Sequence, residues 1–189
     1  MAADPACFTP LAPHTYISGL RVVVAGGDRS PHPVTTGQVD ADAVHAYLYG
    51  QCHALAQAIS EATGWEMAAL ATVDCCCVVP YVAPCRAAPV GANVRACQPE
   101  HVMAVRPSDG AFVDITGARP ADCVPPGYRA VPMTAALAAH IATNWAWAAP
   151  NVEVARTFVE PLLNSLSAPG STVRAPDVGV WARPATEEG

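Results

Sequence analysis

The sequence predicts an α+β fold in which a helix beginning near Cys52 packs on an antiparallel sheet. Apolar residues recur at helical spacing over residues 51–63, and a glycine follows where such a helix would end. Residues 101–106 and 111–116 are β-compatible runs joined by the turn sequence PSDG, which is typical of a hairpin. Together these two patterns indicate a helix packed on a sheet.

One domain is expected. A chain of 189 residues that is 52% hydrophobic can bury one sizeable core. We assign residues 16–167 to a single domain. Residues 1–15 carry three prolines and little pattern, which indicates an N-terminal arm, and residues 168–189 form a C-terminal strand or tail in which VGVWARP is an edge-strand candidate.

The other elements follow from local patterning. Leu20–Ala25 is a short apolar strand, Pro31–Gly37 is expected to be a loop, and Asp40 or Asp42 can cap a helix that runs through Leu48. The remaining elements, in chain order, are strands over 67–73 and 75–82, an irregular crossing over 118–132, a helix over 134–147, and a helix over 151–165 that Pro161 can kink or break.

Cys52 opens the buried side of the helix over residues 51–63. One stripe at helical spacing consists of Cys52, Leu55, Ala56, Ile59 and Ala62. Adjacent helix positions diverge by about 100°, so His53 is expected to leave this stripe as a solvent-facing or helix-start histidine. Taken alone, Cys52 is most simply a small buried residue. A role as a nucleophile is favoured only if suitable residues lie next to it in space.

The hairpin supplies those neighbours. Closing it symmetrically about its turn sets His101 opposite Thr116 and Asp114 opposite Met103. His101 and Asp114 then project from the same face as diagonal neighbours, roughly 7–8 Å apart at Cα. A helix laid over that face would bring the Cys52 thiol towards the imidazole, which predicts a Cys-His-Asp constellation.

Each member of that constellation has a chemical task. A helix N-terminus stabilises a thiolate at Cys52, His101 would exchange the thiol proton with the leaving group, and Asp114 would fix the imidazole. The amides at Cys52 and His53 are candidate oxyanion donors, and the Gln51 side chain is a further one.

The order and setting of these residues resemble the papain-like and transglutaminase-like cysteine hydrolases. The likeness runs from Tyr47 to Ala118 and rests on the GQCHALAQAI helix, the following TGW, a strand that opens with His101, and DGAFVDITGA. The resemblance implies a peptidase, amidase, deamidase or acyltransferase that acts on a protein or peptide amide through Cys52. It implies no cofactor and no catalytic metal.

Composition and charge limit the classes of partner and the cellular locations that we expect. The net charge is −6, and the ten basic residues are scattered arginines, so nucleic-acid binding is disfavoured. No apolar run approaches the roughly 20 residues of a membrane span, and the N-terminus lacks a signal-peptide pattern. We therefore expect no membrane association and a cytoplasmic location, with a virus-like particle as the alternative.

Two other functions remain open. The chain ends are rich in Ala, Pro and Gly and should order only when tied down, which suggests a non-catalytic structural subunit of a larger assembly, such as a virion or tail component. A weaker possibility is a zinc-stabilised binding module. Its candidate ligands have poor spacing and are more simply buried thiols: Cys75, Cys77, Cys85 and Cys97.

Overall fold

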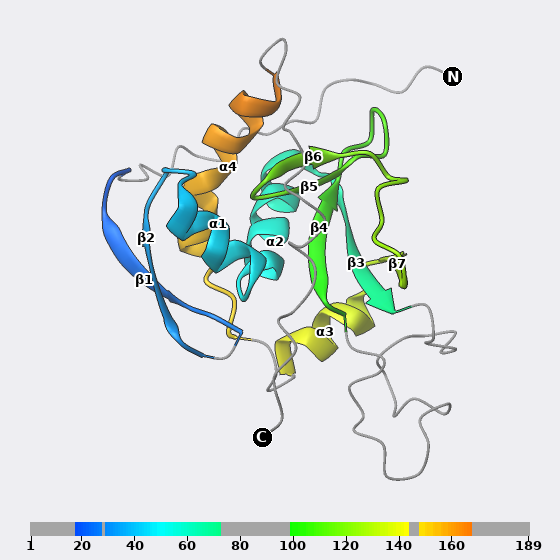
Figure 1. Cartoon of the computed structure of the whole chain (residues 1–189), viewed down its shortest axis with the longest axis horizontal. Helices are drawn as coiled ribbons and strands as arrows, with labels where there is room; N and C mark the ends of the chain where they lie inside the picture. Colours follow the sequence, from blue (N-terminus) through cyan, green and yellow to red (C-terminus); the bar gives the residue numbers. More distant parts are fainter. Residues whose placement is uncertain (1–17, 28, 73–98, 144–147, 168–189) are drawn as a thin grey trace.

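A computed structural model describes residues 18–27, 29–72, 99–143 and 148–167, and within them the chain is a mixed α+β fold (Figure 1). A five-stranded antiparallel sheet has the order β6-β5-β4-β3-β7, and β1 pairs with β2 in a separate antiparallel ribbon. The strands are β1 (Arg21–Ala25), β2 (Pro31–Thr35), β3 (Glu66–Thr72), β4 (His101–Val105), β5 (Phe112–Asp114), β6 (Gly117–Arg119) and β7 (Tyr128–Pro132). The helices are α1 (Ala41–Leu48), α2 (Cys52–Thr63), α3 (Ala135–Thr143) and α4 (Val152–Ser167).

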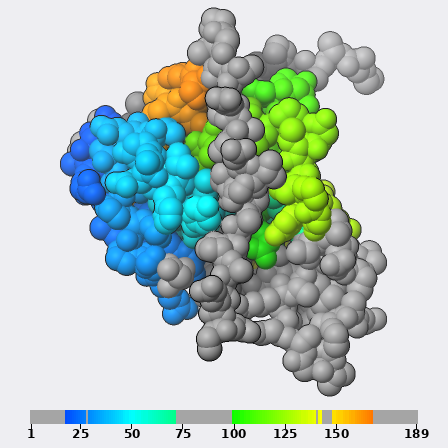
Figure 2. Space-filling model, viewed as in Figure 1, coloured from blue at the N-terminus to red at the C-terminus, as the bar shows by residue number. Residues whose placement is uncertain are grey.

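Helix α2 lies at the centre of the fold. It contacts strands β3, β4 and β5 of the sheet on one side and helices α1 and α4 on the other, while α1 packs in turn on β2 (Figure 1). In the space-filling view, β1, β2 and α1 form one side of the molecule and the strands of the sheet the other (Figure 2). A helix packed on an antiparallel sheet is the arrangement that the sequence predicts.

Both helices that lead to the site have the boundaries that their sequence indicates. The side chain of Asp40 caps α1 by accepting a hydrogen bond from the Ala43 N–H at 2.9 Å. Helix α2 ends at Gly64, whose φ of 73° is a left-handed conformation that favours a residue without Cβ. Helix α4 runs through Pro161 as one element because its buried side, with Phe158 and Leu162, packs on α2.

The hairpin register is confirmed. Ala104 pairs with Val113 and Val105 with Phe112, and the Arg106 N–H closes the loop on the Ala111 carbonyl at 2.8 Å. Because the loop has four residues, the two strands keep the pairing that the sequence predicts. His101 and Asp114 therefore belong to the same face of the sheet.

Two expected loops are strands instead. Pro31–Gly37 contains β2, where Pro31 and Pro33 occupy alternate positions whose missing N–H would point away from β1. The expected crossing over 118–132 contains part of β6 and all of β7, which is an edge strand paired only with β3 among the described strands. Prolines lie inside β2 and in the segment that leads into β7, so local composition indicated loops at both places.

Several expectations fall outside the described residues. These are the arm over residues 1–15, the strand over 75–82, the last turn of the helix expected over 134–147, and the C-terminal tail over 168–189. The candidate zinc ligands also lie there: Cys75, Cys77, Cys85 and Cys97.

Candidate active site

Gln51, the residue before Cys52, holds the start of α2 against two segments that are distant in the sequence. Gln51 is fully buried, and its amide nitrogen donates to the carbonyl of Ala25 at 2.7 Å and to that of Ala149 at 3.2 Å. Its side-chain oxygen accepts from the Asn151 N–H at 2.9 Å. Both amide hydrogens are therefore engaged by backbone carbonyls, and in this arrangement the Gln51 side chain positions the helix and does not face an oxyanion.

Gly50 allows the chain before α2 to pack closely against Gly26 and Gly27, which follow β1. A Cβ at this position would lie 2.5 Å from the Cα of Gly26, so no larger residue fits without movement of the backbone. The Gly27 N–H donates to the carbonyl of Tyr49 at 2.8 Å and completes the contact. Cys52 then begins α2 at 4% exposure, one residue beyond the fastened position.

His101 and Asp114 meet as the hairpin register predicts. The Nε2 atom of His101 lies 3.1 Å from Oδ2 of Asp114, and the two residues are 1% and 5% exposed. Because Nε2 faces the carboxylate, Nδ1 is the ring nitrogen left for a second partner.

Asp114 is held as a carboxylate by further donors. Its Oδ1 accepts from the Thr116 N–H at 2.8 Å and from the Thr116 hydroxyl, and its Oδ2 lies 3.3 Å from a guanidinium nitrogen of Arg119. Burial alone would raise the pKa of this carboxyl, but the hydrogen bond and charge of His101, with Arg119 and Thr116, keep the pKa below its ordinary value. Asp114 can therefore orient the imidazole as an anion.

Sequence reasoning missed Arg119 and Thr116. The structure places them through the tight connection between β5 and β6, where Asp114 pairs with Gly117 and Phe112 with Arg119. Gly117 has a φ of 110°, which only glycine adopts without strain. The Asp-Ile-Thr-Gly sequence was the available signal for this turn.

The prediction that α2 covers the His101 face is wrong. The sheet residues that cluster with α2 are Val102, Ala104 and Val113, which alternate with His101 and Asp114 and so belong to the opposite face. His101 nevertheless reaches the start of α2. It stands at the first position of β4, where it pairs with Leu70 of β3 and lies beyond the stretch of β4 that pairs with β5.

The Cys52 thiol and the His101 ring form a coupled, buried pair. Burial alone would raise the pKa of Cys52, but the charge and hydrogen bond of His101, with a smaller contribution from His53, lower it from 9.0 to about 6. Burial alone would lower the pKa of His101, but the thiolate charge and the Asp114 hydrogen bond raise it from 6.5 to about 9. Between these values the pair is a thiolate and an imidazolium.

His53 is placed differently from the expectation of a solvent-facing residue. It is 8% exposed, and its Nε2 lies 3.1 Å from the carbonyl of Ala148. Its ring helps to lower the pKa of Cys52 by hydrogen bonding and charge. The cause is tertiary packing: α3 packs in the same cluster as Cys52, and Ala148 and Pro150 lie beside the ring, so a residue off the main stripe is buried there as well.

The first turn of α2 also contains the backbone N–H groups that the sequence predicts as oxyanion donors. The first N–H groups of any helix have no intrahelical acceptor, and Gln51 makes no side-chain cap to them. The amides of Cys52 and His53 are the first two of α2 and stay the candidate oxyanion donors.

Metal binding and membrane insertion find no support in the described part of the chain. There, no three His, Cys, Asp or Glu side chains gather into a possible metal site, and no helix has the length and apolar character to cross a bilayer. Comparison of the whole chain with models of protein families, with curated proteins and with solved structures finds no match.

Proposed function

We propose that this protein is a thiol-dependent hydrolase or acyltransferase that works through an acyl-enzyme on Cys52. The observation that carries the proposal is the buried chain from Cys52 through His101 to Asp114 at the start of a helix. A lowered thiol pKa beside an oriented imidazole is the arrangement that cysteine nucleophiles use. The resemblance to papain-like and transglutaminase-like enzymes agrees with it and suggests a protein or peptide amide substrate.

The reaction follows from the ionisation of the pair. The Cys52 thiolate attacks the carbonyl carbon, and the carbonyl oxygen takes the negative charge near the amides of Cys52 and His53. His101 then gives its proton to the leaving nitrogen as the carbon–nitrogen bond breaks, which leaves a thioester on Cys52. Water or an acceptor amine attacks that thioester while His101 takes up the incoming proton, and the thiol is released.

Detection of the acyl-enzyme tests the proposal. Incubation with an activated ester such as p-nitrophenyl acetate should add one acetyl group to Cys52, located by mass spectrometry after proteolysis. The variant Cys52→Ala should lose that adduct, whereas Cys123→Ala should keep it, because Cys123 is an exposed thiol elsewhere in the chain. Acetylation spread evenly over the cysteines would refute a special nucleophile.

The burial of the site favours a second candidate function. Cys52 is 4% and His101 1% exposed, so the same scaffold is compatible with a non-catalytic structural subunit of a larger assembly, such as a virion or tail component. Sedimentation of the purified chain at several concentrations separates the two functions. Stable large particles together with an unreactive Cys52 would support the subunit, and a reactive Cys52 in a monomer would support the enzyme.

A further inference from the structure

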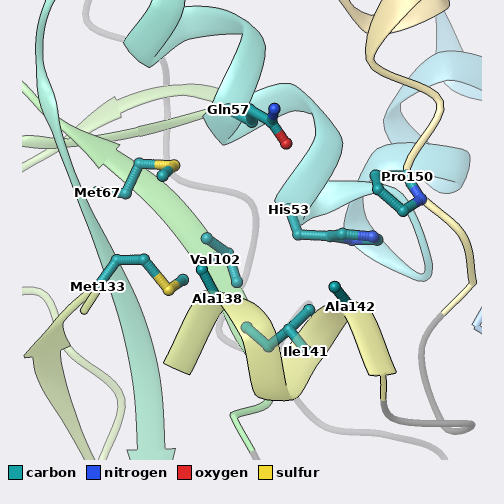
Figure 3. Close-up of a pocket in the computed structure, with 9 residues that line it drawn as sticks. All are labelled: His53, Gln57, Met67, Val102, Met133, Ala138, Ile141, Ala142 and Pro150. Carbon is teal, nitrogen blue, oxygen red and sulfur yellow. The ribbon is translucent and has the colours of Figure 1, made fainter. Parts of the chain in front are cut away.

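A small apolar cavity lies beside the first turn of α2. Its volume is about 70 Å³. Figure 3 shows His53 and Gln57 on α2 above it, Met67 and Met133 at one side, and the α3 residues Ala138 and Ile141 below. Helix α2 thus supplies the polar side chains of the wall, and the sheet and α3 supply apolar ones.

This cavity borders the apolar cluster that contains Cys52, although Cys52 itself does not line it. Val102 and Ile141 line it and pack in the same cluster as Cys52, and Met67 and Met133 pack against that cluster. His53 also connects the two places, because its ring lines the cavity and helps to lower the pKa of Cys52. Val102, Ile141 and His53 thus separate the Cys52 side chain from this cavity by a single layer of side chains.

The size and lining of the cavity define the group that fits. A cavity needs roughly 10–15 Å³ of such volume for each water-sized occupant, so the space holds about five such groups. Methionine side chains adapt to irregular aliphatic shapes, and no Asp, Glu, Lys or Arg is among the described residues that line the wall. A branched chain of four or five carbons fits, and its polar neighbours in the described wall would be His53 and Gln57 on the α2 side.

We propose that this cavity binds the acyl side of the substrate and selects a short branched aliphatic chain. The inference rests on the proposed acyl-enzyme at Cys52 and names its substrate class: amides or thioesters whose acyl half ends in such a chain. The chain can come from a simple branched acyl group or from a leucine-like side chain of a peptide. The polar part of the substrate then lies along α2, beside His53 and Gln57.

Acyl transfer from a series of p-nitrophenyl esters tests the selection. Isovaleryl, acetyl, octanoyl and benzoyl esters are compared by the rate at which each acylates Cys52, divided by its rate on Cys123 in the same molecule. The isovaleryl ester should exceed the acetyl and benzoyl esters by at least about tenfold after this correction. The esters of N-acetyl-leucine and N-acetyl-glycine form a second arm, and a leucine preference without an isovaleryl preference assigns the chain to a peptide.

The failures of the two proposals differ. If no ester acylates Cys52 faster than Cys123, the acyl-enzyme itself is refuted. If Cys52 is acylated quickly and at equal corrected rates by all the esters, the enzyme stands and the cavity proposal is overturned.

Binding without catalysis gives an independent measurement. In protein with ¹³C-labelled methionine methyl groups, isovaleramide should shift the Met67 and Met133 signals and leave Met103, which does not line the cavity. Ala138→Phe fills the cavity from α3 and should abolish both the shifts and the isovaleryl preference. Ala136→Phe is the matched control on another side of the same helix, and equal effects of the two variants would overturn the proposal.

Discussion

Removal of the His101 imidazole should change the pH dependence of Cys52 alkylation in a characteristic way. With a pKa of about 6, half of the Cys52 thiols are ionised near pH 6. In His101→Ala the thiol loses its main cationic partner and remains buried. Its pKa should then return towards 9.0, which leaves about 0.1% thiolate near pH 6.

The rate change is smaller than the change in thiolate because a more basic thiolate is a better nucleophile. The thiolate population near pH 6 falls by about 500-fold. A Brønsted slope of 0.4–0.5 over three pKa units makes each remaining thiolate about 20-fold more reactive. The net effect is about 25-fold slower alkylation. Near pH 8 the population falls only about tenfold, so the same correction makes the variant about twofold faster than the wild type.

The assay is limited labelling with iodoacetamide, a small uncharged reagent, with Cys52 and Cys123 quantified in the same digest. His101→Gln serves as a second variant that keeps a neutral polar group, and urea unfolding shows whether each variant is folded. If folded variants label Cys52 as fast as the wild type near pH 6, and no reversal occurs near pH 8, the thiolate–imidazolium pair is refuted.

Three further variants probe the support of the site. Asp114→Asn should slow Cys52 labelling near pH 6 less than His101→Ala does, because the carboxylate acts through the imidazole; an equal or larger slowing in a folded variant would contradict this order. Gly50→Ala should cost about 1–3 kcal/mol in urea unfolding, because its Cβ would overlap the Gly26 backbone, and an unchanged midpoint would contradict the close approach. Tyr47→Phe should be neutral or stabilise by about 1 kcal/mol, because the buried hydroxyl has no partner among the described residues, and a clear loss would show that it has one.

The fold around the site was predictable where residues close together in the sequence determine the structure. The Asp40 cap, the Gly64 terminus and the PSDG turn each have a short-range cause, and the structure has the corresponding elements at those places. The turn also fixed the parity of the hairpin, which is why His101 and Asp114 could be paired in advance.

Features that depend on distant packing were not predictable in this way. The burial of His53 results from its contacts with α3 and with Ala148 and Pro150, and Ala148 lies 95 residues away in the sequence. The face on which α2 lies was misassigned because both faces of the hairpin are apolar, and alternation alone does not choose between them. The hydrogen bonds of Gln51 to residues 25, 149 and 151 have no local sequence signal.

The Gln51 junction also bears on the order in which the protein folds. Although Cys52, His101 and Asp114 all lie within Tyr47–Ala118, the start of α2 is held by contacts that span up to 100 residues of chain. Contacts of such separation form after local ones, because a long loop must close first. A nascent chain that has emerged only as far as Ala118 would contain every proposed catalytic group and still lack the fixed helix start, so reactivity should arise only once the segment before α4 has docked.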